Sequence, residues 1–371
     1  MKRAVIFLII LTLPMLLHAE AEEAQDAIDA LLETIDLTEW DAWFRENGPD
    51  GMLPSDILKH LAKMQTIGDP DSLQKDLFSI MKPSIKAAAA NTALLLGLAA
   101  FGAALQGISG SSSIGETAGA VFRFSAAAAI LVVLLAEIRA AYSALSGIGS
   151  LSELLLPVIV GYLTLSGFEN TALLLPASYA LLSDVVLRMI ETCIAPMAVI
   201  GGVILVFDAN GRGRLASVGR LLQRASKWIL ATACSLYMVV TAVRSAAAKG
   251  ADSLLIKTAR LAARSIPAVG SLLSESVDTA FQCMRLVKNI LGLTGCIVLL
   301  SVALKPVISV FLTRSSFRAS ALLSEPLSGK PYAELLRGVG DTLHILMLSE
   351  LAALGMALMM LVPVLGTGGA P

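Results

Sequence analysis

The chain has 371 residues, of which 56% are hydrophobic and 15% are charged, and its formal net charge is −1. Soluble domains carry roughly 25% charged residues, so this composition excludes an ordinary soluble protein and favours an integral membrane protein. The charge is unevenly divided: residues 22–86 hold 14 acidic and 6 basic residues, whereas residues 87–371 hold 14 acidic and 20 basic ones. The first part is expected to be solvated, and the cations of the second part lie between apolar segments.

The N-terminus has the pattern of an export signal. Lys2 and Arg3 precede an apolar core over residues 4–17, and small residues occupy positions 19 and 21. These features predict a secretory signal peptide over residues 1–21. An uncleaved membrane anchor is the alternative.

Residues 22–86 are predicted to form a small helical region outside the cytoplasm. Apolar residues recur there at helical spacing, and a turn-rich stretch at residues 48–51 separates them from a second predicted helix over residues 72–81. A region of this length builds only a small core, so we expect it to rest on the membrane or on a partner.

The remainder, residues 87–371, is predicted to be a multi-span membrane domain, and the fold class is therefore all-α. A span needs about 20 apolar residues, and several candidates are shorter. Proline and glycine near residues 157–176 predict broken or re-entrant helices, with a tight turn at Glu169-Asn170. The apolar segments lie at 87–108, 120–138, 153–168, 171–187, 193–207, 228–243, 290–312 and 342–365.

The orientation follows from the distribution of basic residues. If the N-terminal region is outside, five spans bring the chain to the cytoplasm at Asp208, just before a cluster of arginines, as the positive-inside rule requires. The same scheme puts the basic residues between Arg244 and Arg264 on the outer side, which conflicts with that rule.

Two amphipathic helices are predicted between the spans, near residues 211–227 and 253–289. In both stretches an apolar stripe lies opposite charged or polar residues. Such helices lie at a membrane interface or pack on partner helices.

No catalytic motif is present, because the chain lacks a phosphate-binding loop, a zinc-protease helix, a nucleophile elbow and a dinucleotide fingerprint. The cysteines have no CxxC spacing and the histidines are scattered. We therefore expect a protein that is not an enzyme, without a cofactor, metal site or nucleic-acid partner.

Ionisable residues at membrane depth are the strongest candidates for function, because an unpaired charge in hydrocarbon is costly. Lys305 lies in an apolar segment beside Pro306, whose ring is expected to break the helix there. Arg188 and Glu191 are spaced for an ion pair on a helix. The alternative for each is a side chain that reaches the membrane surface.

A polar block between the later spans carries a resemblance to a known family. Its pattern is K-T-A-R…P-A-V-G…S-x-x-x-D-T…V-K-N-x-x-G-L-x-G, beginning at Lys257 and ending at Gly295. This pattern, together with the order of signal, exported region and spans, resembles the stage III sporulation protein AE family.

The resemblance implies a non-enzymatic integral subunit of a stage III A-type channel or secretion-like complex between mother cell and forespore, needed for endospore development. It implies a multi-pass protein of the mother-cell membrane facing the forespore, with other sporulation stage III membrane proteins as partners in a hetero-oligomer. A stand-alone multi-span transporter is the alternative. The candidate assembly or pathway residues are Lys257, Arg260, Arg264, Pro267, Gly270, Asp278, Lys288, Asn289, Gly292, Gly295 and Lys305.

Overall fold

The computed structural model describes residues 41–43, 45, 70–109, 113–165, 168–208, 215–264, 270–328 and 330–366. These residues are almost entirely helical and include no strand, which confirms the all-α class. The predicted signal peptide and most of the predicted exported region lie outside them. Residues 41–43 and 45 are helical, and the last part of the exported region belongs to the first long helix.

Short segments that contain glycine or proline separate the helices. The segments between the described helices contain Gly110, Gly167, Gly211, Pro267 and Gly329, and glycine and proline have the lowest helix propensity. The break predicted at Pro267 lies outside the described residues, which end at Arg264 and resume at Gly270. The helices are α5 (Pro70–Ser109), α6 (Ser113–Leu165), α7 (Glu169–Met189), the π-helical η2 (Ile190–Ile194), α8 (Ala195–Asp208), α9 (Ala216–Arg264), α10 (Gly270–Ser328) and α11 (Lys330–Gly366).

Within the described part of the chain, six helices are long and apolar enough to cross a membrane, instead of the eight predicted spans. Segments 120–138 and 153–168 are joined in α6, and segments 171–187 and 193–207 are joined through η2. The residues between the two spans of each pair include polar ones but no proline, so the helix continues across them. The apolar part of α6, Phe124–Thr164, has 41 residues. At 1.5 Å per residue it is roughly twice as long as the hydrocarbon core is thick, so it extends beyond that core.

Prolines inside the helices do not end them. Pro157 lies within α6, Pro176 within α7 and Pro306 within α10, so the breaks predicted at these residues are wrong. In a membrane bundle, neighbouring helices and local adjustment compensate for the hydrogen bond that a proline removes. The tight turn predicted at Glu169-Asn170 is not at these residues, because both are helical and form the start of α7, whereas α6 ends at Leu165.

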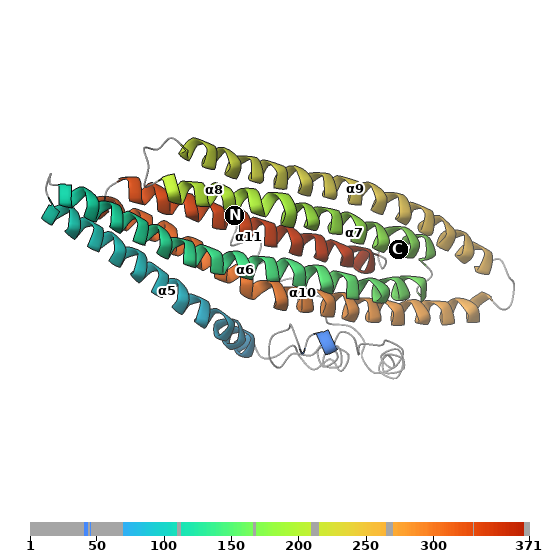
Figure 1. The fold of residues 1–371 in the computed structure, drawn as a ribbon. Helices are drawn as coiled ribbons and strands as arrows, with labels where there is room; N and C mark the ends of the chain where they lie inside the picture. Colours follow the sequence, from blue (N-terminus) through green and yellow to red (C-terminus); the bar gives the residue numbers. More distant parts are fainter. Residues whose placement is uncertain are drawn as a thin grey trace.

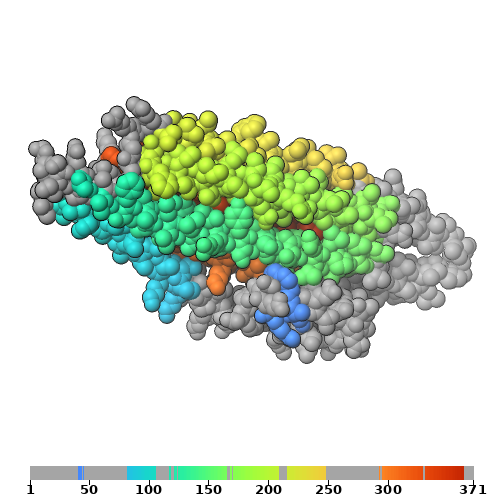
Figure 2. Space-filling view, in the orientation of Figure 1, coloured from blue at the N-terminus to red at the C-terminus, as the bar shows by residue number. Residues whose placement is uncertain are grey.

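The helices lie along one another in an elongated bundle with α11 in its interior (Figure 1). Helix α11 contacts every helix from α6 to α10, whereas α5 packs mainly on α10 and α6. In the most apolar window of α11, 56% of the residues are buried, against 17% in α5 and in α9. Figure 2 shows the face covered by α6, α7 and α8, through which little of α11 is visible.

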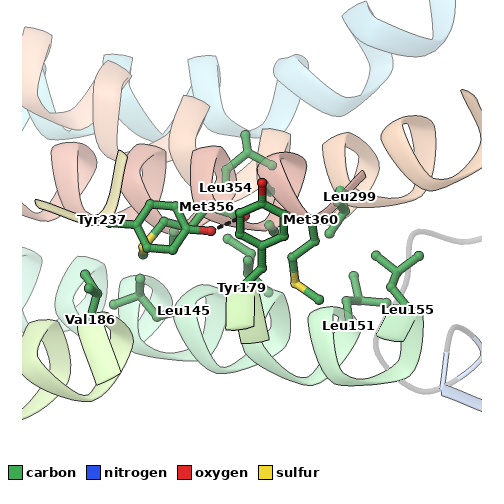
Figure 3. Packing of buried hydrophobic residues seen from close by; sticks show 14 of the residues in the cluster. Leu145, Leu151, Leu155, Tyr179, Val186, Tyr237, Leu299, Leu354, Met356 and Met360 are labelled. Atoms are coloured by element: carbon green, nitrogen blue, oxygen red, sulfur yellow. Dashed lines mark hydrogen bonds between the residues drawn. The ribbon is translucent and has the colours of Figure 1, made fainter. Parts of the chain in front are cut away.

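The buried side chains form two clusters that follow each other along the bundle. The α7-side core joins residues 145–163 of α6 to α7, α9, residues 298–303 of α10 and residues 345–361 of α11. It is largely aliphatic, with Tyr179 and Tyr237 at its centre (Figure 3). The α5-side core joins α5 and residues 122–141 of α6 to α8, residues 310–321 of α10 and residues 332–347 of α11.

The two amphipathic stretches are parts of longer helices. Residues 216–227 form the first turns of α9, and residues 253–289 comprise the end of α9 and the beginning of α10. The start of α9 is tied to α8, because the backbone N–H of Ala216 donates to the buried carboxylate of Asp208 over 2.7 Å. This contact satisfies one of the free N–H groups at a helix N-terminus.

Candidate functional site

The residues of the polar block fall on the two helices that flank Pro267. Lys257, Arg260 and Arg264 belong to the last turns of α9, and the residues from Gly270 to Gly295 lie in the first half of α10. The side chains of residues 248–291 and Pro267 itself lie outside the part of the chain that the structure describes. The predicted role of Lys257, Arg260, Arg264, Pro267, Gly270, Asp278, Lys288 and Asn289 therefore stays a prediction.

The two glycines that end the block are buried. A Cβ atom on Gly295 would lie 2.9 Å from Leu361 Cδ2 and 3.6 Å from Leu155 Cδ2. A side chain there would have to displace the end of the Leu361 side chain, so Gly295 allows α10 to pack closely against α11 and α6. Close packing through small residues is the usual way in which membrane helices associate.

Lys305 lies on the outer surface of the chain, not in its interior. The structure thus excludes a place for Lys305 inside this bundle, and Pro306 does not break α10 beside it. The candidate span Gly295–Ser328 includes Lys305. An exposed cation in such a span is expected to reach lipid head groups or to contact another protein.

Arg188 and Glu191 occupy the junction between α7 and η2. The ion pair of Arg188 is with Asp184, one turn earlier, over 2.8 Å between Nε and Oδ2, and Glu191 adds a weaker electrostatic interaction. The backbone carbonyl of Glu191 accepts a hydrogen bond from the hydroxyl of Tyr142 on α6 over 3.0 Å. A regular helix would use this carbonyl for a hydrogen bond of its own. At the π-helical turn the carbonyl instead bonds to Tyr142, and this contact ties α6 to the α7–α8 helix.

A central polar layer lies where the two cores meet, and it consists of Glu137 on α6, Ser309 and Thr313 on α10, and Glu350 on α11. Thr313 Oγ1 donates to Glu137 Oε1 over 2.8 Å, and Ser309 Oγ donates to Glu137 Oε2 over 3.5 Å. Glu350 is fully buried, and neither of its carboxylate oxygens has a hydrogen-bond partner among the described residues. The two glutamates interact electrostatically.

A basic cluster lies farther along the bundle, toward the connection between α10 and α11. Asp341 on α11 pairs with Arg318 over 3.4 Å and with Lys227 over 3.9 Å. Arg314 interacts electrostatically with Arg318 and Asp341, and His344 interacts with all four of these charged residues. One carboxylate therefore faces three cations, which leaves a local excess of positive charge.

Close backbone packing and buried amide hydrogen bonds join α8, α9 and α11. A Cβ atom on Gly201 would lie 2.8 Å from the carbonyl oxygen of Gly219, and a Cβ atom on Gly219 would lie 2.8 Å from that of Gly201. Beside this contact, the buried Gln223 Nε2 donates to Gly338 O and to Thr342 Oγ1, both over 2.9 Å.

Among the described residues, no group of three or more His, Cys, Asp or Glu side chains could hold a metal ion. Sequence reasoning had singled out neither Glu350 nor Gln223. Glu350 was detectable as an acidic residue within an apolar segment, whereas the partners of Gln223 are distant in sequence.

Comparison with known proteins identifies the family. The profile of "Stage III sporulation protein AE" matches residues 53–368. The chain is 24% identical over 330 residues to "Stage III sporulation protein AE" of Bacillus subtilis (strain 168), an alignment that covers 85% of this chain and 81% of that protein. No solved structure is significantly similar to the chain. The match over most of the chain, with its six apolar helices, confirms the resemblance seen in the polar block: the chain belongs to the stage III sporulation protein AE family.

Proposed function

We propose that this protein is a non-enzymatic integral membrane subunit of a stage III A-type channel or secretion-like complex between mother cell and forespore. It resides in the mother-cell membrane facing the forespore and is needed for endospore development. Its partners are other sporulation stage III membrane proteins, with which it forms a hetero-oligomer.

Membership of the stage III sporulation protein AE family over residues 53–368 is the observation that carries this proposal. The six helices that are long and apolar enough to cross a membrane fit a multi-pass subunit. The side chains gathered in the bundle interior make helix-to-helix contacts, which suits a scaffold or channel component.

The proposed orientation puts the N-terminal region outside the cytoplasm. With two pairs of predicted spans joined into single helices, three spans instead of five precede Asp208. Both numbers are odd, so the chain still reaches the cytoplasm at Asp208. The basic residues from Arg212 to Lys227 follow directly, in agreement with the positive-inside rule. On the outer side, Arg244 donates a hydrogen bond to Ser178 Oγ, which ties this exposed cation to α7.

The assembly surface is proposed to include the cations near the Pro267 turn and Lys305. Lys257, Arg260 and Arg264 are spaced three and four residues apart on α9, so they share one face of that helix. Lys305 adds an exposed cation within a membrane span. Acidic segments of partner subunits are the chemistry that would complement both.

An in-frame deletion in the source organism tests the proposal, with complementation by the wild-type gene and by an Arg260→Glu/Arg264→Glu variant. The deletion is expected to arrest development after engulfment and to abolish late forespore reporter expression. The variant is expected to reach the membrane at the wild-type level but to co-purify with fewer of the other stage III proteins.

Normal spores from the deletion strain would contradict the proposed function and favour a stand-alone transporter. Undiminished co-purification of the double variant would contradict the assembly surface alone, leaving contact with lipid head groups for these arginines. Microscopy and affinity purification thus test the two parts separately.

A further inference from the structure

Glu350 is buried more completely than any other acidic side chain that the structure describes. It lies on α11, its exposed fraction is 0%, and both Oε atoms are without a hydrogen-bond partner among the described residues. An ionised carboxylate without hydrogen bonds or a counter-ion is strongly disfavoured in such a place. Something other than a neighbouring side chain must therefore compensate its charge.

Glu137 contrasts with Glu350, because it is equipped to remain ionised. Its two carboxylate oxygens accept hydrogen bonds from the hydroxyls of Thr313 and Ser309, and its side chain is only partly buried. Hydrogen bonds that donate to a carboxylate favour the charged form. A second negative charge on the neighbouring Glu350 would be repelled by Glu137, so the pair is expected to carry one charge between them.

Apart from Glu137, the described charged groups on the other helices packed against α11 are exposed or interact with other groups. On α6, Arg139 and Glu153 are exposed, and on α9 so are Arg220, Arg224 and Arg244. On α7, Asp184 and Arg188 pair with each other, and on α9 Lys227 pairs with Asp341. On α10, Arg314 interacts with Arg318 and Asp341, and Lys305 is exposed. The group that interacts electrostatically with Glu350 is Glu137, so the local environment of Glu350 offers no compensating cation within the described part of the chain.

The full burial of Glu350 restricts what can compensate it. A lipid head group or a side chain of another subunit cannot reach a carboxyl group with no exposed surface. A proton is small enough to bind a buried carboxyl group, and it does not need several ligands. A metal ion needs several ligands, and no group of three or more His, Cys, Asp or Glu side chains is arranged for one among the described residues.

We propose that Glu350 is a proton-binding site: the folded protein holds its carboxyl group in the neutral acid form beside the ionised carboxylate of Glu137. The site bridges the two cores: Glu137 and Thr313 fall within the α5-side ranges on α6 and α10, whereas Glu350 falls within the α7-side range on α11. Release of the proton puts an unpaired charge at this junction, so packing of the two cores depends on proton binding.

The experiment compares the full-length protein with Glu350→Gln in lipid nanodiscs by infrared spectroscopy. The wild-type spectrum is expected to contain the carbonyl band of a buried protonated carboxylic acid, and Glu350→Gln to lack it. Glutamine keeps the size and neutrality of the acid, so the fold should persist. Glu334→Gln, an exposed site on the same helix, is the matched control and should leave the band unchanged.

Thermal unfolding as a function of pH gives a second readout. The folded chain binds a proton that the unfolded chain releases, so wild-type stability should fall as the pH rises from acidic to alkaline. Glu350→Gln should reduce this dependence. Glu137→Gln removes the neighbouring negative charge, and in that variant the infrared band should therefore disappear at a lower pH than in the wild type.

Two outcomes would overturn the proposal. A carbonyl band that is absent from the wild type at every pH, or unchanged in Glu350→Gln, would mean that Glu350 is ionised. Stabilisation of the wild type by Na⁺ but not by K⁺ at equal ionic strength would identify the occupant as a metal ion. If Glu350→Gln failed to fold, the pH titration of the band in the wild type and in Glu137→Gln would still decide.

Discussion

The two cores of the bundle are stabilised by different interactions. The α7-side core is built mainly from leucine, isoleucine and alanine, and its interhelical hydrogen bonds come from two tyrosines: Tyr237 donates to Met356 O, and Tyr179 is hydrogen-bonded to Ser245. On the α5 side, polar groups on different helices meet repeatedly. Ser328 donates to Ala99 O over 2.5 Å, and Tyr332 donates to Leu95 O over 3.1 Å.

This difference matters because the surrounding lipid is as apolar as a leucine side chain. Burial of aliphatic groups therefore does little to prefer one helix arrangement over another, whereas close backbone contact and directed hydrogen bonds do. We infer that the glycine contacts and hydrogen bonds around the α5-side core fix the register of the helices, and that the α7-side core then fills the remaining space.

The strongest test concerns the glycine contact between α8 and α9. Gly201→Leu is expected to destabilise the protein by about 3 kcal/mol or more, because even a Cβ atom there would lie 2.8 Å from a backbone oxygen that cannot move away. Thermal unfolding in detergent and the amount of protein in membranes measure the effect. Gly97→Leu is the control, since nothing lies within 4 Å of its Cβ position. Equal losses in the two variants would remove the argument for a register contact.

A smaller effect is expected for the amide that links α9 to α11. Gln223→Leu should cost about 1 kcal/mol, because it removes the hydrogen bonds to Gly338 O and Thr342 Oγ1 while nearly preserving volume. A double-mutant cycle with Thr342→Val should reveal coupling between the two sites. Thr232→Val, which removes an exposed hydroxyl from the same helix as Gln223, serves as the control. Additive effects in the cycle would contradict a direct hydrogen bond.

The smallest effect is expected in the α7-side core. Tyr237→Phe removes the hydroxyl that donates to Met356 O over 3.2 Å but retains the buried ring (Figure 3), so we expect a loss of about 0.5 kcal/mol. Thermal unfolding under the conditions used for Gln223→Leu provides the comparison. A loss greater than that of Gln223→Leu would mean that directed bonds matter as much in the α7-side core.

The sequence predicted part of the candidate site through local chemistry alone. The small size of Gly295 indicated close helix packing, and the structure confirms it through Leu361. The sequence left open whether Lys305 faces a protein interior or reaches the membrane surface, because helical periodicity does not tell which face of a uniformly apolar helix meets lipid; in this chain the residue is exposed. Glu350 was missed since its isolation depends on the helices packed around α11.

What the sequence determined by itself is the all-α membrane class of the protein. Apolar segments require helices in a membrane, because every backbone group must be satisfied internally. Only the tertiary structure decided that Pro157, Pro176 and Pro306 lie within continuous helices and that eight predicted spans become six. A proline ends an isolated helix, but in a bundle the packing of both flanking segments against their neighbours outweighs the lost hydrogen bond.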